Sequence, residues 1–269
     1  MIPAGFDYER AASVEQAVEL LGRTDDAKAI AGGHSLIPLM RLRFARPSLL
    51  VDIGRIPGLS YVREEGEWVA VGALTRHAEL ERDPVLAAEC ALLAQAAERI
   101  GDPQIRHRGT IGGSIAHGDP ASDLSSCLLA LDAELVALGP DGERTIPAGE
   151  FFTGFFETAL GQQDVLTEIR VPKVSTSTYV KFSRRAHDWA TVGVAAARVN
   201  GGARVALTNM GLTPLRARGV EEALSSGADA ATAAQRAGEG TAPPSDPSGS
   251  AEYRRHLAQV LVRRALEAL

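Results

Sequence analysis

Cysteine is scarce in this chain of 269 residues, which has only Cys90 and Cys127. Each lies in an apolar pattern of helical type, with no second cysteine or histidine at metal-ligand spacing beside it. The histidines form no HxH or HxxxH pair. These absences exclude an iron–sulfur cluster and a structural zinc site within the chain, so any redox metal must belong to another chain. We expect both thiols to be buried and inert.

Long hydrophobic runs and charge of one sign are also lacking. No apolar run approaches the roughly 20 residues that a membrane helix needs, and the amino terminus resembles no signal peptide. The formal net charge is -6, with both signs scattered along the chain, so no basic stripe predicts binding to nucleic acid or lipid. We expect a cytoplasmic protein with no nucleic acid partner and no membrane insertion.

Strand and helix patterns alternate up to about residue 175. The Ser13 to Gln16 segment is a capping box, which predicts a helix start. A break at Val171-Pro172, followed by Ser175 to Thr178, predicts a domain boundary near residue 175. The other expected elements are strands at 27–31, 48–53 and 133–138, a hairpin at 61–71 turning at Glu65-Gly66, helices at 35–44 and 84–100, and a helix at 124–131 capped at Asp119-Pro120.

Beyond residue 175 the pattern is that of a small antiparallel sheet with helices. Three strands are expected at 179–183, 191–199 and 204–210, the last two joined across Asn200-Gly201-Gly202. Residues 238–250 have loop composition, and residues 251–269 read as a closing helix with one apolar face.

Two glycine loops carry the chemistry, Ala31-Gly32-Gly33-His34-Ser35 and Thr110-Ile111-Gly112-Gly113-Ser114. Glycine lets successive backbone N–H groups approach a diphosphate from a turn or a helix start, without a lysine. We expect the amides of both loops to clamp a pyrophosphate from two sides. The alternative is that each glycine pair only turns the chain.

Two other nucleotide sites fit less well. Asp52 lies about 20 residues past the first loop, where a Rossmann fold places its ribose-binding acid. Neither loop has the GxGxxG spacing, however, and neither has the Gly-Lys-Ser of a Walker loop.

The two loops belong to a longer set of motifs, in which the sequence resembles the FAD-binding medium subunit of molybdenum hydroxylases, of the aerobic carbon monoxide dehydrogenase medium-chain type. The resemblance covers essentially the whole chain. The motifs that carry it are Ala31 to Met40, Val71-Gly72-Ala73, Ile100 to Arg106, Gly109 to Ser114, Asp119 to Leu124, Lys181 to Arg185, Thr213 to Ala217 and Tyr253-Arg254-Arg255.

The resemblance implies an α+β fold: a vanillyl-alcohol-oxidase (PCMH-type) FAD-binding domain at 1–175, with subdomains at about 1–55 and 56–175, and a carboxy-terminal domain at 176–269. It implies FAD in this chain, and iron–sulfur clusters and a molybdenum cofactor on a small and a large partner subunit. The assembly would be a dimer of heterotrimers. Electrons from the clusters would pass through the FAD to a quinone, dioxygen, NAD or another acceptor.

The resemblance also assigns residues to the cofactor. The pyrophosphate contacts fall on Ala31, Gly32, Gly33, His34, Ser35, Leu36, Thr110, Ile111, Gly112, Gly113 and Ser114, flanked by Ala29 and Ile30. Asp123 would accept from ribityl hydroxyls, Leu166 would cover apolar surface, and Lys181 would stabilise charge on the reduced ring. Each also has a plain alternative: a first-turn acid, a core leucine and a solvated lysine.

Further residues lie near the expected site, and alternative functions stay open. Trp189 stands where relatives often have a tyrosine near the flavin, and it could equally pack inside the small domain. Ser114 replaces an asparagine common in relatives. His34 and His117 flank the loops, and we expect them only to pack or to hydrogen-bond locally. A self-sufficient flavin oxidase or reductase of the same fold and a scaffold without cofactor are the alternative functions, and neither substrate nor acceptor can be identified from the sequence.

Overall fold

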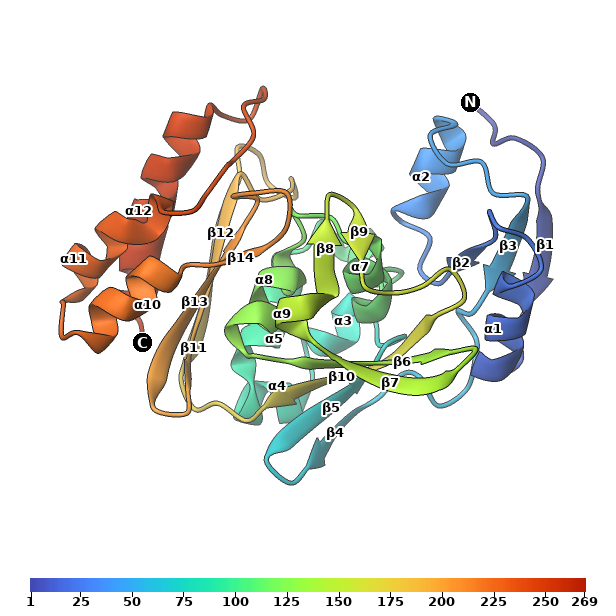
Figure 1. Ribbon diagram of the computed structural model, residues 1–269, viewed down its shortest axis with the longest axis horizontal. Coiled ribbons are helices and arrows are strands. Elements are labelled where there is room, and N and C mark those ends of the chain that lie inside the picture. The colour runs from blue at the N-terminus through green and yellow to red at the C-terminus, as the bar shows by residue number, and fades with distance from the viewer.

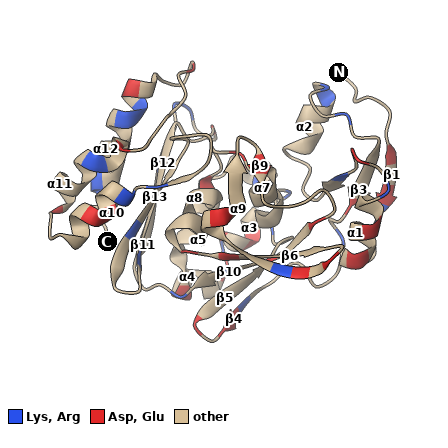
Figure 2. Cartoon of the chain, viewed as in Figure 1, with Lys and Arg blue, Asp and Glu red and all other residues tan.

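The computed structural model describes residues 1–269, and its ribbon has three parts side by side (Figure 1). A small sheet at the amino-terminal end is followed by a central five-stranded sheet with helices, and then by a four-stranded sheet backed by helices. Acidic and basic residues occur in all three parts (Figure 2). No helix is both long enough and apolar enough to cross a bilayer.

The amino-terminal part is a parallel sheet of order β1-β3-β2 with one helix packed on it. Ser13 Oγ accepts from the Gln16 amide at 3.2 Å, and Gln16 Oε1 accepts from the Ala12 amide at 2.7 Å. These bonds confirm the predicted helix start. The elements are β1 (Asp7–Arg10), α1 (Val14–Leu21), β2 (Lys28–Ile30), α2 (Leu36–Arg41) and β3 (Leu49–Asp52).

The central part is an antiparallel sheet of order β4-β5-β10-β6-β7. The predicted hairpin is confirmed as β4 (Val62–Glu65) and β5 (Trp68–Gly72). The other strands are β6 (Glu134–Gly139), β7 (Gly142–Pro147) and β10 (Val165–Pro172), with a separate short pair β8 (Phe152–Gly154) and β9 (Glu157–Thr158). The helices are α3 (His77–Leu80), α4 (Pro84–Glu89), α5 (Ala91–Glu98), α6 (Pro103–Arg106), α7 (Ile111–His117), α8 (Asp123–Ala130) and α9 (Ala148–Phe151).

Two helix predictions in this part were wrong in detail. The helix expected at 84–100 is broken at Cys90, whose backbone (φ -156°, ψ 66°) leaves the helical region. Both halves bury side chains in one core, so the apolar spacing continues through the break. Asp119-Pro120 does not cap α8: Asp119 Oδ1 accepts from the Ala121 amide in a turn, and the helix starts one residue after Ser122.

The carboxy-terminal sheet has the order β11-β12-β13-β14, and the three predicted strands and the Asn200-Gly201-Gly202 turn are confirmed. A fourth, two-residue strand was not predicted. The elements are β11 (Ser177–Phe182), β12 (Val192–Val199), β13 (Gly202–Thr208), β14 (Leu215–Arg216), α10 (Arg218–Ser225), α11 (Ala230–Ala234), a 3-10 turn at Gln235–Gly238 and α12 (Ala251–Glu267).

This sheet packs on both faces. Val192, Val194 and Ala196 point into a core shared with α12, whereas Ala195 and Ala197 join the core of the central part. The alternation follows from the two-residue period of a strand. The predicted boundary near residue 175 stays a prediction, because one hydrophobic core continues across it.

Both cysteines are buried, as expected. Burial raises the pKa of the Cys90 thiol to about 12 and raises that of Cys127 as well. Neither thiol is a nucleophile at neutral pH.

Candidate functional site

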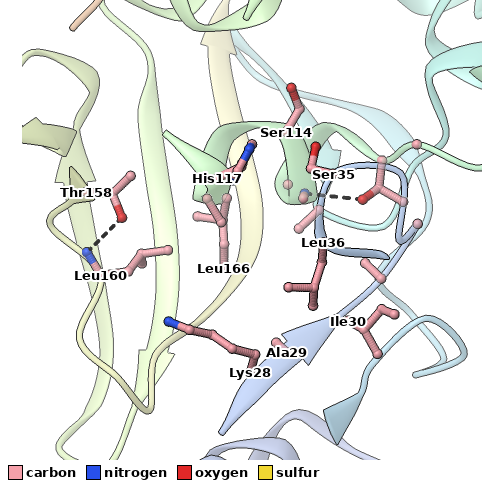
Figure 3. Close-up of a pocket in the computed structure, with 18 of the residues that line it drawn as sticks. Lys28, Ala29, Ile30, Ser35, Leu36, Ser114, His117, Thr158, Leu160 and Leu166 are labelled. Carbon is pink, nitrogen blue, oxygen red and sulfur yellow. Dashed lines mark hydrogen bonds between the residues drawn. The ribbon is translucent and has the colours of Figure 1, made fainter. Parts of the chain in front are cut away.

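A cavity of about 720 Å³ lies between the amino-terminal sheet and the central part, and both glycine loops line it. Figure 3 shows Ser35, Leu36, Ser114 and Leu166 among the residues that line it. Of the residues expected to hold a cofactor, all but Ile111 and Lys181 line this cavity. Those that do are Ala29, Ile30, Ala31, Gly32, Gly33, His34, Ser35, Leu36, Thr110, Gly112, Gly113, Ser114, Asp123 and Leu166.

The first loop presents a run of unpaired donors. The backbone amides of residues 32–36 donate to no acceptor within the chain. Gly33 has φ +79°, which an L side chain rarely adopts. A Cβ on Gly32 would lie 2.3 Å from the Arg108 carbonyl oxygen, so the loop backbone presses directly against the segment that leads into the second loop. The loop therefore presents a row of free N–H groups, a cradle that suits an anion, and positions 32 and 33 favour glycine.

The second loop differs from the first. The Gly112 amide donates to Ala73 O at 2.8 Å, the Ser114 amide to Thr110 O at 3.0 Å, and the Gly113 amide to Thr110 Oγ1 at 3.2 Å. The expectation that both loops offer free amides was wrong here, because Thr110 caps α7 and the Gly112 amide is bonded to Ala73, the residue after β5. A Cβ on Gly112 would lie 2.5 Å from the Ala73 Cβ, so this glycine allows close packing.

Asp123 opens α8 and is 3% exposed. Its Oδ1 accepts from the Tyr179 hydroxyl at 2.5 Å, and its Oδ2 accepts from Lys181 Nζ at 2.9 Å. Burial raises the pKa of the Asp123 carboxyl, against the lowering effect of Lys181. Lys181 Nζ also donates to Arg99 O at 2.9 Å, so the ammonium group is held by two acceptors within the protein. Asp123 lines the cavity, whereas Lys181 does not.

Apolar side chains line much of the remaining cavity wall. Ala29 and Ile30 end β2, and Leu166 projects from β10 on the opposite side. Ile111 is fully buried and belongs to the central core, so its contribution is packing.

Several lining residues were missed from the sequence. Phe156 connects β8 to β9, Thr158 ends β9, and Leu160 follows it. No alternation of apolar and polar residues in the sequence predicted this strand pair. The doublets Phe151-Phe152 and Phe155-Phe156 around a glycine were the available signal. His117 packs against Phe156 with the ring centroids 4.9 Å apart and the rings tilted by 49°, and burial lowers the pKa of this histidine. Its local packing is therefore as expected.

Trp189 lines the cavity and is 58% exposed. Its loop is fixed by His187, whose Nδ1 lies 2.8 Å from Gly101 O. Trp189 is therefore not packed inside the small domain, which was one of the two positions considered for it.

The cavity suits a dinucleotide with a central diphosphate. Its volume lies in the range of cofactor sites, the loop with the row of free amides lines it, and apolar side chains form part of its wall. A buried carboxylate at one side offers acceptor lone pairs for hydroxyl groups.

Known proteins resemble this chain in sequence and in fold. The sequence model of the FAD binding domain in molybdopterin dehydrogenase matches residues 4–174, and that of the CO dehydrogenase flavoprotein C-terminal domain matches residues 177–269. The carbon monoxide dehydrogenase medium chain of Hydrogenophaga pseudoflava is 44% identical, with 100% of this chain and 98% of the relative covered. A 6-hydroxypseudooxynicotine dehydrogenase complex subunit alpha of Paenarthrobacter nicotinovorans is 42% identical, covering 99% and 95%.

Solved structures agree. A carbon monoxide dehydrogenase from H. pseudoflava that lacks the Mo-pyranopterin moiety of its cofactor superposes with a TM-score of 0.96 at 46% identity, covering 100% of this chain and 98% of the other. Quinoline 2-oxidoreductase of Pseudomonas putida gives 0.93 at 30% identity with the same coverage. These matches confirm the expected α+β flavoprotein fold. The chain belongs to the family of FAD-binding medium subunits of molybdenum hydroxylases, and is an oxidoreductase subunit.

Proposed function

We propose that this chain holds one FAD in the cavity described above and relays electrons through it, from iron–sulfur clusters on a partner chain to an external acceptor. The observation that carries the proposal is the row of unpaired amides at residues 32–36, inside a cavity of cofactor size. When bound, FAD supplies the redox chemistry, accepting and releasing electrons.

The residues divide the work by chemistry. We propose that the first loop donates its amides to the pyrophosphate, and that the second loop contributes hydroxyl groups and close packing. Ala29, Ile30 and Leu166 would cover apolar parts of the cofactor. Asp123 keeps lone pairs for a ribityl hydroxyl beyond its two present donors. Lys181 would act through Asp123, because its ammonium is held on the carboxylate.

For partners, we propose a small iron–sulfur subunit and a large molybdenum-cofactor subunit, paired into a dimer of heterotrimers in the cytoplasm. One relative is the medium chain of a carbon monoxide dehydrogenase, a similar solved structure is described as a form of such an enzyme that lacks part of its molybdenum cofactor, and another relative is subunit alpha of a dehydrogenase complex. The segment around α2 also exposes three large apolar side chains, Ile37, Leu42 and Phe44, which suit contact with another protein. The two-domain division at residue 175 belongs to the same proposal.

The direct test is FAD uptake by the purified full chain. We expect a yellow protein with a flavin absorption spectrum and micromolar or tighter affinity for FAD. A colourless protein that ignores added FAD, alone and in its complex, would refute the proposal. Turnover of an organic substrate by this chain alone would favour the alternative, a self-sufficient flavin oxidase or reductase.

A further inference from the structure

His77 is a buried histidine that neither glycine loop includes. It begins α3, is 4% exposed and lines the cavity. Its backbone amide donates to Gly109 O at 3.1 Å. A Cβ on Gly109 would lie 2.6 Å from His77 Cδ2 and 2.8 Å from His77 Nε2, so the ring lies against the residue before the second loop. The imidazole therefore takes the space that any larger residue at position 109 would need.

The ring of His77 is neutral, and neither of its nitrogens has a hydrogen-bond partner within the protein. Burial first, and then the charges of Arg76 and Arg106, lower the pKa of His77 to about 4. A neutral imidazole has one N–H donor and one acceptor nitrogen. Nδ1 is buried without any hydrogen-bond partner. An orphaned N–H is rarer in proteins than an orphaned acceptor, so the proton belongs on Nε2, beside Gly109.

This N–H is close to the point where the two loops meet. Gly109 follows Arg108, whose carbonyl oxygen presses on Gly32 in the first loop. Gly109 and His77 both line the cavity there. Neither ring nitrogen makes a hydrogen bond within the protein, and of the two only Nδ1 is completely buried. Nε2 is therefore the ring nitrogen that is open to a ligand in the cavity, whereas a leucine would fill similar space without offering a donor.

We propose that His77 Nε2–H donates a hydrogen bond to an oxygen of bound FAD, which makes His77 a cofactor-binding residue outside both glycine loops. The inference rests on the proposed function. It adds a neutral imidazole donor to the backbone amides of the first loop and the hydroxyl groups of the second.

Three substitutions separate donation from packing. In His77→Gln the side-chain nitrogen is as many bonds from Cβ as Nε2 is, so it keeps the donor. His77→Leu removes the donor, and His77→Asn moves it back to the Nδ1 position. We expect FAD affinity, measured by titration of the full chain, to fall roughly tenfold in the Leu and Asn variants and to stay within about threefold in the Gln variant.

A second readout excludes a merely structural role. The melting temperature of the FAD-free Leu variant should equal or exceed that of the wild type, because the orphaned nitrogen is gone, while its increase on adding FAD should be smaller. ADP, which has the adenosine and the diphosphate of FAD but lacks the ribityl chain and the flavin ring, locates the acceptor. If the Leu variant weakens ADP binding as much as FAD binding, the acceptor lies in the ADP half of the cofactor; if only FAD binding weakens, it lies on the ribityl chain or the ring.

The inference is overturned if the Leu variant binds FAD as the wild type does, or if the Gln variant is as weak as the Leu variant. Failure of the proposed function is distinct, since the wild-type chain itself would then not bind FAD. If the Leu variant does not fold, His77→Met makes the same comparison.

Discussion

Replacing Gly32 by alanine tests the first-loop cradle most directly. The new Cβ would lie 2.3 Å from Arg108 O and 2.9 Å from Gly109 Cα. Both are backbone atoms, so no side chain can rotate away. Restoring an ordinary contact of about 3.4 Å requires a shift of about 1 Å, and overpacking of this kind costs about 1–3 kcal/mol.

The larger effect should be on FAD. A 1 Å shift moves the amides of Gly33 and His34 away from the pyrophosphate, and hydrogen bonds to charged groups contribute about 1.5–3 kcal/mol each. Losing two of them predicts an affinity at least about 100-fold weaker. Calorimetric titration with FAD measures this, with the melting temperature of the FAD-free protein recorded in parallel.

The matched control is Gly149→Ala. Gly149 lies in the short helix α9 with nothing within 4 Å of its Cβ position and an ordinary φ. It should bind FAD as the wild type does. If Gly32→Ala also binds within threefold of the wild type, the steric reasoning about the cradle is wrong.

Three further outcomes are expected. Gly112→Asp should lower the melting temperature of the FAD-free chain, because its Cβ would meet Ala73 at 2.5 Å; an unchanged melting temperature would contradict the packing role. The pKa of His77 lies below its usual 6.5, so the fold favours the neutral ring: stability should be full above pH 6.5 and fall by about 3 kcal/mol toward pH 4. Urea unfolding at several pH values checks this, and His77→Leu should show a shallower acid limb. Asp123→Asn and Lys181→Met should each destabilise the chain by about 3–5 kcal/mol by leaving one buried partner unpaired, while the double variant recovers part of the loss; simple additivity in urea unfolding would refute the coupling.

Local signals in the sequence predicted most of the elements and the centre of the site. The Ser13 cap, the Glu65-Gly66 hairpin and the first glycine loop are each fixed by a few neighbouring residues, so spacing alone identified them. The fates of the second-loop amides and of Lys181 depend on partners distant in sequence, such as Ala73 and Asp123. The spacing of residues along the chain does not show that Ala73 accepts from a second-loop amide or that Asp123 accepts from Lys181.

His77 and the β8–β9 pair illustrate the same limit in another way. A histidine at a helix start looks like a surface residue until the fold brings Gly109 against its ring. The β8–β9 hairpin is too short for a period-two pattern, so its place in the cavity wall comes only from packing.

The packing of the carboxy-terminal sheet on both faces also affects how the site can be dissected. Tyr179 and Lys181 lie on β11, yet they supply both of the side-chain donors to Asp123 at the cavity wall. A fragment that ends near residue 175 would therefore carry every glycine of the two loops and still have an unneutralised carboxylate beside the cofactor. The cavity wall therefore needs residues from both sides of position 175. Mutations of Tyr179 or Lys181 on β11 should be interpreted first as changes to the surroundings of Asp123 in the cofactor site.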